Sequence, residues 1–307
     1  MTGDADGNSQ DILESMDRPL MNTRELADYL GLKERKIYDL VAKREIPCTR
    51  VTGKWLFHRE LIDRWLLEHA EGLGTTPAAP PPAIVAGSHD PLLDWAVRES
   101  GCGLALLFDG SLDGLARFAR GEALACGIHV PDPSGEYNTP LIRQQLPRQP
   151  LVALEWAWRE QGLILAPGNP RGVRGLADTA GLRFALRQSG SGSRVLLEQL
   201  LAAENLSLKD LSPTSPPRRS ELEVGLMIAG READVGLGIH AVARQLGLDF
   251  VALARERYDI VLRRRDYFEA AFQKLMAFSR EAAFREQAGR LAGYDVAGLG
   301  TVRYNGP

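Results

Sequence analysis

Residues 187–194, with the sequence RQSGSGSR, have the residue types of an anion-binding turn. They follow an apolar run at residues 182–186, predicted to be a buried strand, and precede residues 195–201, predicted to be a helix. A glycine-rich turn at a helix start leaves backbone N–H groups unpaired at the positive end of the helix dipole. Three hydroxyls share this turn, those of Ser189, Ser191 and Ser193. The stretch predicts a site for a small oxyanion, with a flexible connection as the alternative.

Serine also follows two earlier predicted strands. Ser88 comes directly after residues 84–87, and Ser111 follows residues 104–108 after a short turn. Ligands of open α/β sheets bind at the carboxyl ends of strands. We therefore expect both serines to converge with residues 187–194 on one cleft.

Histidines occupy similar positions. His89 and His129 stand at predicted strand ends, where each either donates a hydrogen bond to an oxyanion or has a structural role. The predicted ligand-binding residues are Ser88, His89, Ser111, His129, Ser189, Ser191, Ser193 and Arg194.

Other residues near this site have competing interpretations. Arg187 and Arg194 flank the serine turn, and each either touches the ligand or pairs with a nearby carboxylate. Asp234 would repel an anion and is interpreted as structural. Trp156 and Trp158 are expected to pack in a core.

Short apolar runs alternate with helical patterns from residue 84 onward, which is typical of an α/β fold. The predicted strands span residues 84–87, 104–108, 125–130, 163–166, 182–186, 234–237, 250–254 and 259–262.

The chain before residue 71 has a different pattern. Asn22 or Thr23 caps a predicted helix at residues 24–30, and Glu25 is placed for a capping box with Asn22. After a turn at Gly31, the pattern predicts a second helix at 33–45, a hairpin at 51–57 and a last helix at about 59–69. Four apolar residues are expected on one side of the last helix: Leu61, Ile62, Trp65 and Leu66.

Two helices at a glycine turn followed by a hairpin wing form a winged helix-turn-helix pattern. The run TRELADYLGL at residues 23–32, the pair Ile37 and Tyr38, and the Pro47, Trp55 and Phe57 hairpin resemble the excisionase-type family. We expect residues on the second helix and the wing to contact double-stranded DNA. These residues are Lys33, Arg35, Lys36, Lys43, Arg44, Arg50 and Lys54.

Changes in composition along the chain predict its domain organisation. The sequence predicts a disordered tail at 1–20, the helix-turn-helix domain at 21–70, a proline-rich linker at 71–83 and a ligand-binding domain at 84–307. The net charge of −3 excludes a chain coated with basic residues. The three cysteines lack metal spacing, and neither a signal peptide nor a membrane-spanning run is present. We expect a cytoplasmic protein that does not enter a membrane.

The segments GSHDP (87–91), SLDGL (111–115), RGEA (120–123), GIH (127–129), RQSGSGSR (187–194) and ADVGLGI (233–239) carry a second resemblance. They are similar to the type II periplasmic-binding-protein fold in its molybdate-binding-like branch. The resemblance implies a ligand between two lobes, placed at about 84–155 plus 260–307 and at about 160–255. The turn at 236–241 lacks the tyrosine usual in that branch, and Tyr258 is a candidate to reach the cleft.

Together these features predict a ligand-responsive transcriptional regulator that senses a small oxyanion, molybdate or tungstate first. The alternative effectors are a small organic acid and a metabolite related to the molybdenum cofactor. A third hypothesis is an unrecognised enzyme, although the sequence contains no Ser/His/Asp set, no metal-spacing cluster and no phosphate-transfer loop. We expect no cofactor and no resident metal, and a homodimer is the candidate oligomer.

Overall fold

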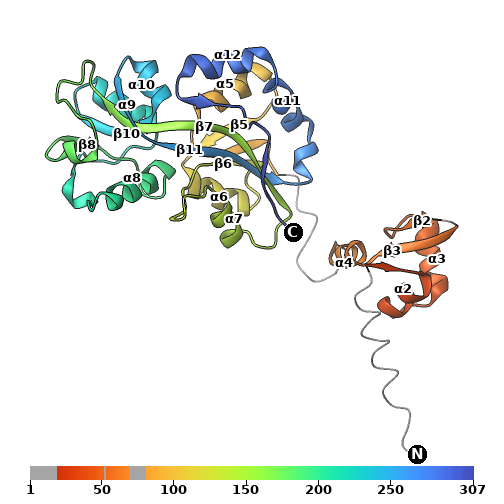
Figure 1. Ribbon diagram of the computed structural model, residues 1–307. Coiled ribbons are helices and arrows are strands. Elements are labelled where there is room, and N and C mark those ends of the chain that lie inside the picture. Colours follow the sequence, from red (N-terminus) through yellow and green to blue (C-terminus); the bar gives the residue numbers. More distant parts are fainter. Residues whose placement is uncertain (1–18, 52, 69–80) are drawn as a thin grey trace, which may run out of the picture. The chain divides into compact units, whose positions relative to one another are not determined.

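The computed structural model describes residues 19–51, 53–68 and 81–307. The chain divides into two compact units, Met1–Ala78 and Ala79–Pro307 (Figure 1). The tail predicted at 1–20 lies outside the described residues except for its last two positions, and Leu20 already belongs to a strand. The linker predicted at 71–83 lies outside them except for residues 81–83.

The N-terminal unit is the winged helix-turn-helix domain predicted from the sequence. Its elements are β1 (Leu20–Met21), α2 (Thr23–Leu30), α3 (Glu34–Ala42), β2 (Thr49–Val51), β3 (Lys54–His58) and α4 (Arg59–Glu68). The three strands form an antiparallel sheet in the order β1-β3-β2. The predicted capping box is confirmed: Asn22 Oδ1 accepts from Glu25 N at 3.0 Å, and Asn22 N donates to Glu25 Oε2 at 2.7 Å.

The ends of α3 differ from the prediction of residues 33–45. Lys33 stands at the N-cap position in an extended conformation, and the helix stops at Ala42. Arg44 then has a φ of 59°, which ends the helical conformation.

The core of this unit corrects the prediction for α4. It is built from Met21, Leu26, Ala27, Ile37, Val41, Ile46, Phe57 and Ile62. Leu61 and Leu66 were expected on the buried side, but 45% and 40% of their surfaces are exposed. So small a domain has too few neighbouring elements to cover more than a narrow stripe of the helix.

The C-terminal unit has the predicted α/β architecture. Its strand order is β5-β4-β6-β11-β7-β10-β8-β9, and β12 and β13 pair with β7. The strands are β4 (Ile84–Gly87), β5 (Ala105–Phe108), β6 (Ala125–Ile128), β7 (Leu151–Leu165), β8 (Arg183–Ala185), β9 (Ser212–Pro213), β10 (Val235–Ile239), β11 (Asp249–Arg263), β12 (Tyr294–Asp295) and β13 (Val302–Asn305).

Two long antiparallel strands, β7 and β11, connect the lobes and correct the sequence prediction. Residues 163–166 were expected as one short strand, and 250–254 and 259–262 as two. Instead each long strand has 15 residues. The end of β7 at Gln161–Leu165 pairs with β10, while the end of β11 at Asp259–Leu262 pairs with β6. The two strands therefore run from one lobe into the other.

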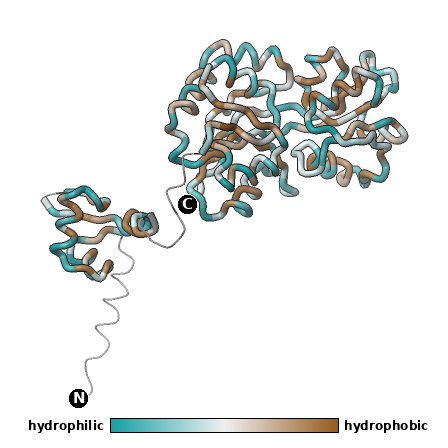
Figure 2. The backbone as a smooth tube through the Cα atoms, turned by 180° about the vertical axis from the view of Figure 1, so that it is seen from behind, coloured by the Kyte–Doolittle hydropathy of each residue, from teal (hydrophilic) through white to brown (hydrophobic). Residues whose placement is uncertain are grey.

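Helices cover the sheet in both lobes. They are α5 (Pro91–Ser100), α6 (Ser111–Ala119), α7 (Thr139–Gln145), α8 (Gly192–Ala203), α9 (Glu221–Ala229), α10 (His240–Leu246), α11 (Ala270–Phe278) and α12 (Ala282–Leu291), with short 3-10 turns at Leu176–Thr179, Leu208–Asp210 and Asp266–Phe268. Hydrophobic residues concentrate on the strands (Figure 2). Among the described residues, none of the helices combines the length and apolarity needed to cross a bilayer.

Each lobe has its own apolar core. In the first lobe, Leu92, Trp156, Phe272 and Phe284 belong to one cluster of buried side chains. In the second lobe, a cluster that includes Phe184, Leu197 and Leu237 packs against one face of the sheet. Because the two cores are separate, neither includes the segment in which β7 and β11 pass from one lobe to the other. This segment can therefore carry polar side chains.

Candidate ligand-binding site between the lobes

Three strand ends of the first lobe meet as predicted. Ser88 follows β4, Ser111 begins α6 after β5, and His129 follows β6. The hydroxyls of Ser88 and Ser111 lie 2.8 Å apart, and Ser111 Oγ accepts from His129 N at 3.2 Å. A side chain at Gly87 would prevent this convergence, because its Cβ would lie 2.1 Å from the Gly127 carbonyl oxygen.

The start of α8 supplies the contribution of the second lobe. The helix begins at Gly192 rather than at the predicted residue 195, because Ser191 is its N-cap and accepts from Arg194 N at 3.3 Å. Ser193 therefore lies in the first helical turn. A Cβ at Gly192 would lie 2.5 Å from the carbonyl oxygen of His129, so the two lobes touch at this point.

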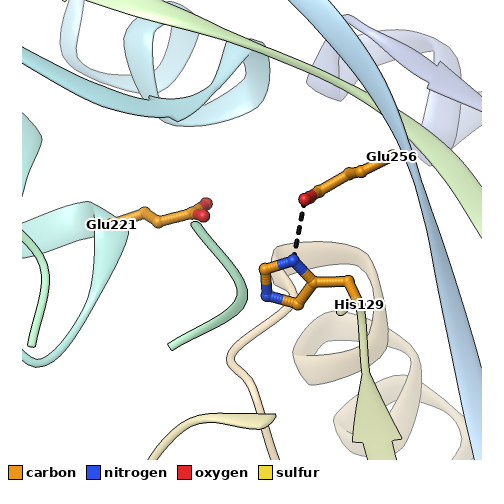
Figure 3. Close-up of side chains that lie close together, drawn as sticks. All are labelled: His129, Glu221 and Glu256. Carbon is orange, nitrogen blue, oxygen red and sulfur yellow. Dashed lines mark hydrogen bonds and ion pairs between the residues drawn. The ribbon is translucent and has the colours of Figure 1, made fainter. Parts of the chain in front are cut away.

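Buried charged residues from the long strands join these groups. Arg159 on β7 stands opposite Glu256 on β11. Arg159 donates through Nη1 to Asp90 Oδ2 at 2.9 Å and through Nη2 to Glu256 Oε1. His129 Nδ1 lies 2.7 Å from Glu256 Oε2 (Figure 3). All four side chains are at most 3% exposed, so the network is screened little by water.

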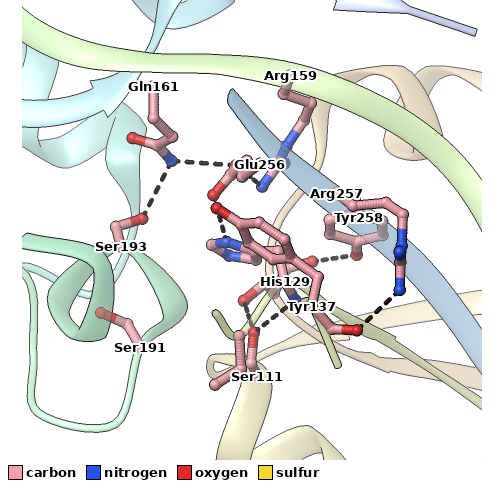
Figure 4. A network of polar contacts seen from close by, with 12 residues as sticks. Ser111, His129, Tyr137, Arg159, Gln161, Ser191, Ser193, Glu256, Arg257 and Tyr258 are labelled. Carbon is pink, nitrogen blue, oxygen red and sulfur yellow. Dashed lines mark hydrogen bonds and ion pairs between the residues drawn. The ribbon is translucent and has the colours of Figure 1, made fainter. Parts of the chain in front are cut away.

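Gln161 links the two carboxylates of the site. Its Nε2 donates to Glu221 Oε1 at 2.8 Å and to Glu256 Oε1 at 3.1 Å. Ser193 Oγ also donates to Glu221 Oε1. We call the buried polar residues at this junction of the lobes the interlobe cluster, and Figure 4 labels all of them except Ser88 and Glu221. The cluster consists of Ser88, Ser111, His129, Arg159, Gln161, Ser191, Ser193, Glu221 and Glu256. The contacts above join all of its members except Ser191, whose Oγ donates to the Gln188 carbonyl at 3.0 Å.

Electrostatics keep the centre of the interlobe cluster ionised. Burial alone would raise the pKa of Glu256, but Arg159 and His129 beside it lower that pKa to about 2. Burial disfavours the charge of Arg159, yet Glu256 and Asp90 raise its pKa well above the ordinary value. The Arg159–Glu256 pair is therefore charged at neutral pH.

Some buried atoms at the site have no hydrogen-bond partner among the described residues. They are Glu221 Oε2, Gln161 Oε1, Arg159 Nε, and Nε and Nη1 of Arg187. Arg187 is 5% exposed, and burial lowers its pKa although Glu221 and Glu223 oppose the shift. Buried polar groups are normally satisfied, so unpaired groups of both kinds mark a place where a ligand can complete the contacts.

The structure brings together most of the predicted ligand-binding residues, but not all. Ser88, Ser111, His129, Ser191 and Ser193 belong to the interlobe cluster.

The side chains of the other three predicted residues do not join it. Ser189 is exposed in the turn before α8. Arg194 donates through Nε to Glu198 at 2.6 Å. His89 packs edge-on against Phe108 with a ring separation of 5.1 Å, and burial lowers its pKa.

Sequence analysis missed the acidic side of the site, Glu221 and Glu256, together with Arg159 and Gln161. Three of these lie within long strands, where the only signal is a charged or polar residue in a largely apolar run. Glu221 begins α9 directly after the N-cap Ser220 and resembles an ordinary first-turn acid.

Other structural interpretations are confirmed. Asp234 pairs with Arg183, with 3.0 Å between Oδ1 and Nη2. Trp156 is buried and donates to Asp90 at 3.1 Å. Tyr258 reaches the site, where its hydroxyl donates to the Ser88 carbonyl at 2.6 Å. For Trp158 the expectation of core packing is wrong, because this side chain is only partly buried and its ring centroid lies 5.6 Å from the guanidinium carbon of Arg255.

The predicted DNA-contacting residues lie on the surface of the N-terminal unit. All seven are exposed, and none forms an ion pair with another described residue. Arg35 and Lys36 lie in the first turns of α3, while Arg50 and Lys54 lie on the wing strands. Arg50 stacks over Trp55 at 5.2 Å, which orients one cation of the wing.

Two relatives match this chain, the first over most of its length and the second over about a quarter of it. The first is the uncharacterized protein YvgK of Bacillus subtilis (strain 168), 24% identical over 304 residues, which span 91% of this chain and 96% of that protein. The second is an uncharacterized protein in the ferredoxin 2Fe-2S gene 5′ region of Clostridium pasteurianum. It is 30% identical over 84 residues, 27% of this chain and 74% of that protein.

Similar solved structures share low sequence identity. An OxyR C206 mutant of Corynebacterium glutamicum matches with a TM-score of 0.47 and 13% identity over 87% of this chain and 90% of that one. The sulphonate-binding protein SsuA of Escherichia coli matches with a TM-score of 0.44 and 16% identity over 69% and 78% of the chains.

Family models match both units. Residues 20–70 match a helix-turn-helix domain, and residues 94–280, more than half of the chain, match the PBP superfamily domain. This chain therefore belongs to the PBP superfamily and carries an excisionase-type helix-turn-helix domain.

Proposed function

We propose that this chain is a ligand-responsive transcriptional regulator. The helix-turn-helix domain binds double-stranded DNA, and the PBP domain binds a small effector at the interlobe cluster. The pairing of these two domains is that of a regulator rather than an enzyme. A regulator acts where its DNA is, and the cytoplasmic location expected from the sequence stays a prediction.

The effector in this proposal is a small anion, and the tetrahedral oxyanions molybdate and tungstate are the first candidates. The observation that carries the proposal is Arg187, a buried guanidinium whose Nε and Nη1 make no hydrogen bond with any described residue. It precedes the turn into α8, where Ser191 and Ser193 are buried and helical N–H groups begin. A charged donor of this kind binds oxyanions and carboxylates strongly.

A second candidate effector has a specific observation in its favour. Glu221 Oε2 and Gln161 Oε1 are buried acceptors that have no partner within the described part of the chain. A small organic acid with a hydroxyl or amino group would satisfy both these acceptors and Arg187, whereas a bare oxyanion offers no donor. A metabolite related to the molybdenum cofactor falls in the same class.

The long strands give the effector a means of control. Because β7 and β11 pass through both lobes, they can bend in the segment between the lobes, and this bending lets the lobes open and close. A ligand that contacts α8 on one lobe and the strand ends on the other stabilises the closed arrangement. Closure of the lobes on the ligand is a conformational change to which the DNA-binding domain of the same chain can respond.

Calorimetric titration of the full chain tests the proposal. We expect molybdate or tungstate, or in the second case a small hydroxy or amino acid, to bind at sub-millimolar concentration. Arg187→Gln should weaken this binding about ten- to a hundredfold, because one donor to a charged group is lost. Arg194→Gln is the control and should change the binding much less, because the Arg194 side chain, in the first turn of α8, is used by Glu198 and by the Arg187 carbonyl.

Three results would contradict the proposal. No anion of either class binds, Arg187→Gln binds as well as the unchanged chain, or a bound compound is converted to product. The last result would support the enzyme hypothesis.

A further inference from the structure

Three buried side chains from separate elements meet inside the interlobe cluster. They are His129 after β6, Glu221 at the start of α9 and Glu256 on β11. One ligand atom from each lies within 4.8 Å of the other two (Figure 3). An imidazole nitrogen and carboxylate oxygens are the protein ligands that first-row transition ions such as zinc and cobalt favour.

Glu221 has an unused ligand atom that faces this group. Its side chain is 5% exposed, and Gln161 and Ser193 both bind Oε1, which leaves Oε2 without a partner. Figure 3 shows the Glu221 carboxylate turned toward His129 and Glu256. Glu221 also has no Lys, Arg or His nitrogen within ion-pair distance among the described residues. A buried carboxylate in this state is costly unless a cation or donor completes it.

The charges around the three residues have a negative excess. Asp90 and Glu256 share the single guanidinium of Arg159, and Glu221 adds a third carboxylate. Arg187 adds a second guanidinium but forms no ion pair among the described residues. With His129 neutral, the form in which it binds a metal ion, three carboxylates face two guanidinium groups. An anion that entered this set would be repelled by Glu221 and Glu256.

A divalent cation bound to these residues would remove the repulsion between an anion and the carboxylates of Glu221 and Glu256. It would bind Glu221 Oε2, His129 and Glu256, and it would turn the negative excess into a positive one. The unpaired nitrogens of Arg187 then remain for the anion. In this way the cation completes Glu221 Oε2 and the anion completes Arg187, whereas the cation does not account for the unpaired Gln161 Oε1.

We propose that His129, Glu221 and Glu256 bind one divalent transition ion of the zinc class, which prepares the interlobe cluster for an anionic effector. The first half of the proposal stands on the geometry of the three residues. The second half rests on the proposed function.

The test uses the full chain, freed of metal with a chelator and titrated with Co²⁺ or Zn²⁺ alone. We expect one ion per chain at sub-millimolar concentration, a visible Co²⁺ absorption band from nitrogen and oxygen ligation, and no comparable binding of Mg²⁺. His129→Gln and Glu221→Gln should each weaken the binding at least about tenfold.

A second His–Glu pair supplies the matched control. His240 Nδ1 lies 2.8 Å from Glu160 Oε2, but both side chains are more than a third exposed. His240→Gln and Glu160→Gln should leave the stoichiometry and affinity unchanged. If a buried variant does not fold, the stoichiometry and Co²⁺ spectrum of the unchanged chain still decide the first half of the proposal.

The outcomes separate the two proposals. Absence of Co²⁺ and Zn²⁺ binding, or loss of binding only in the His240 and Glu160 variants, overturns the cation site. Molybdate titrations with and without Zn²⁺ test the link, and we expect tighter anion binding with the ion present. If the ion binds and the anion affinity does not change, the cation site stands and the link is wrong. If molybdate binds in the absence of any cation site, the proposed function stands alone.

Discussion

Glu256 is the residue that holds the interlobe cluster together. It accepts from Arg159 and Gln161, contacts His129, and is fully buried. Its carboxylate is favoured in the folded state, because Arg159 and His129 outweigh the effect of burial and lower its pKa from 4.5 to about 2. A lowered pKa contributes stability that is complete above the unfolded pKa and is lost as the pH falls through the folded one.

Glu256→Gln should therefore reduce the free energy of unfolding by about 3–5 kcal/mol at neutral pH, since Arg159 loses one of its two carboxylates. The difference from the unchanged chain should shrink as the pH falls from 4.5 to about 2. Denaturant unfolding at a series of pH values measures it, with Glu160→Gln as the control. A difference that stays constant over this range would show that the Glu256 charge is not the cause.

Ser111 and Ser189 were predicted from the sequence to have the same role, and their positions in the structure separate them. Ser111 is fully buried between Ser88 and the backbone of His129, whereas Ser189 is exposed. We expect Ser111→Ala to weaken effector binding about ten- to a hundredfold. Ser189→Ala should have no such effect in the same calorimetric titration. Equal losses in both variants would mean that the turn before α8 moves onto the ligand.

At the residue scale, the repeated pattern of a polar residue after an apolar strand was sufficient to place Ser88, Ser111 and His129 at neighbouring strand ends, while their role in ligand binding stays a prediction. Patterns of this kind are local. Glu221 and Glu256 are far from His129 in the chain, and only the fold brings their carboxylates to its ring. No spacing rule for metal or acid–base sites connects such residues, so sequence reasoning had no means of finding them.

At the scale of elements, five of the short strands in the two lobes were predicted closely, and β4 was predicted at its observed bounds. The long strands were not. Arg159 and Gln161 interrupt the apolar pattern of β7, and Glu256 interrupts that of β11. A method that follows apolar runs breaks a strand at such residues. They remain buried in the strands because they pair with each other across the ladder.

The positions of Arg35 and Lys54 in the helix-turn-helix domain predict different effects on DNA binding when each residue is replaced. Arg35 lies in the first turn of α3, which enters the major groove in domains of this type, and Lys54 begins the wing strand β3. Arg35→Ala should lower the preference for specific over random DNA by about 1–3 kcal/mol at the base it contacts. Lys54→Ala should weaken both kinds of DNA alike and reduce the salt dependence.

Binding assays on specific and random duplexes at several salt concentrations check both variants. If the two variants lower both affinities by the same factor, α3 does not read bases in the assumed way.

At the scale of the molecule, the two-domain organisation followed from composition and pattern, because a helix-turn-helix domain and an α/β domain differ in the spacing of their apolar residues. The buried carboxylates at the centre of the α/β domain could not be predicted from composition or pattern. Donor groups indicated an anion site, while the folded chain adds two carboxylates to the same place. The nature of the effector therefore depends on which charges are present together in the closed cluster.

Regulation by this chain requires that effector binding at the interlobe cluster changes the DNA affinity of the helix-turn-helix domain. The most direct test measures binding of the full chain to DNA from its own promoter region, with and without a saturating anion, in the unchanged chain and in Arg187→Gln. We expect the anion to shift the DNA affinity of the unchanged chain at least about fivefold and to leave that of the variant unchanged at the same anion concentration. An unchanged DNA affinity when calorimetry shows the anion bound would contradict the account.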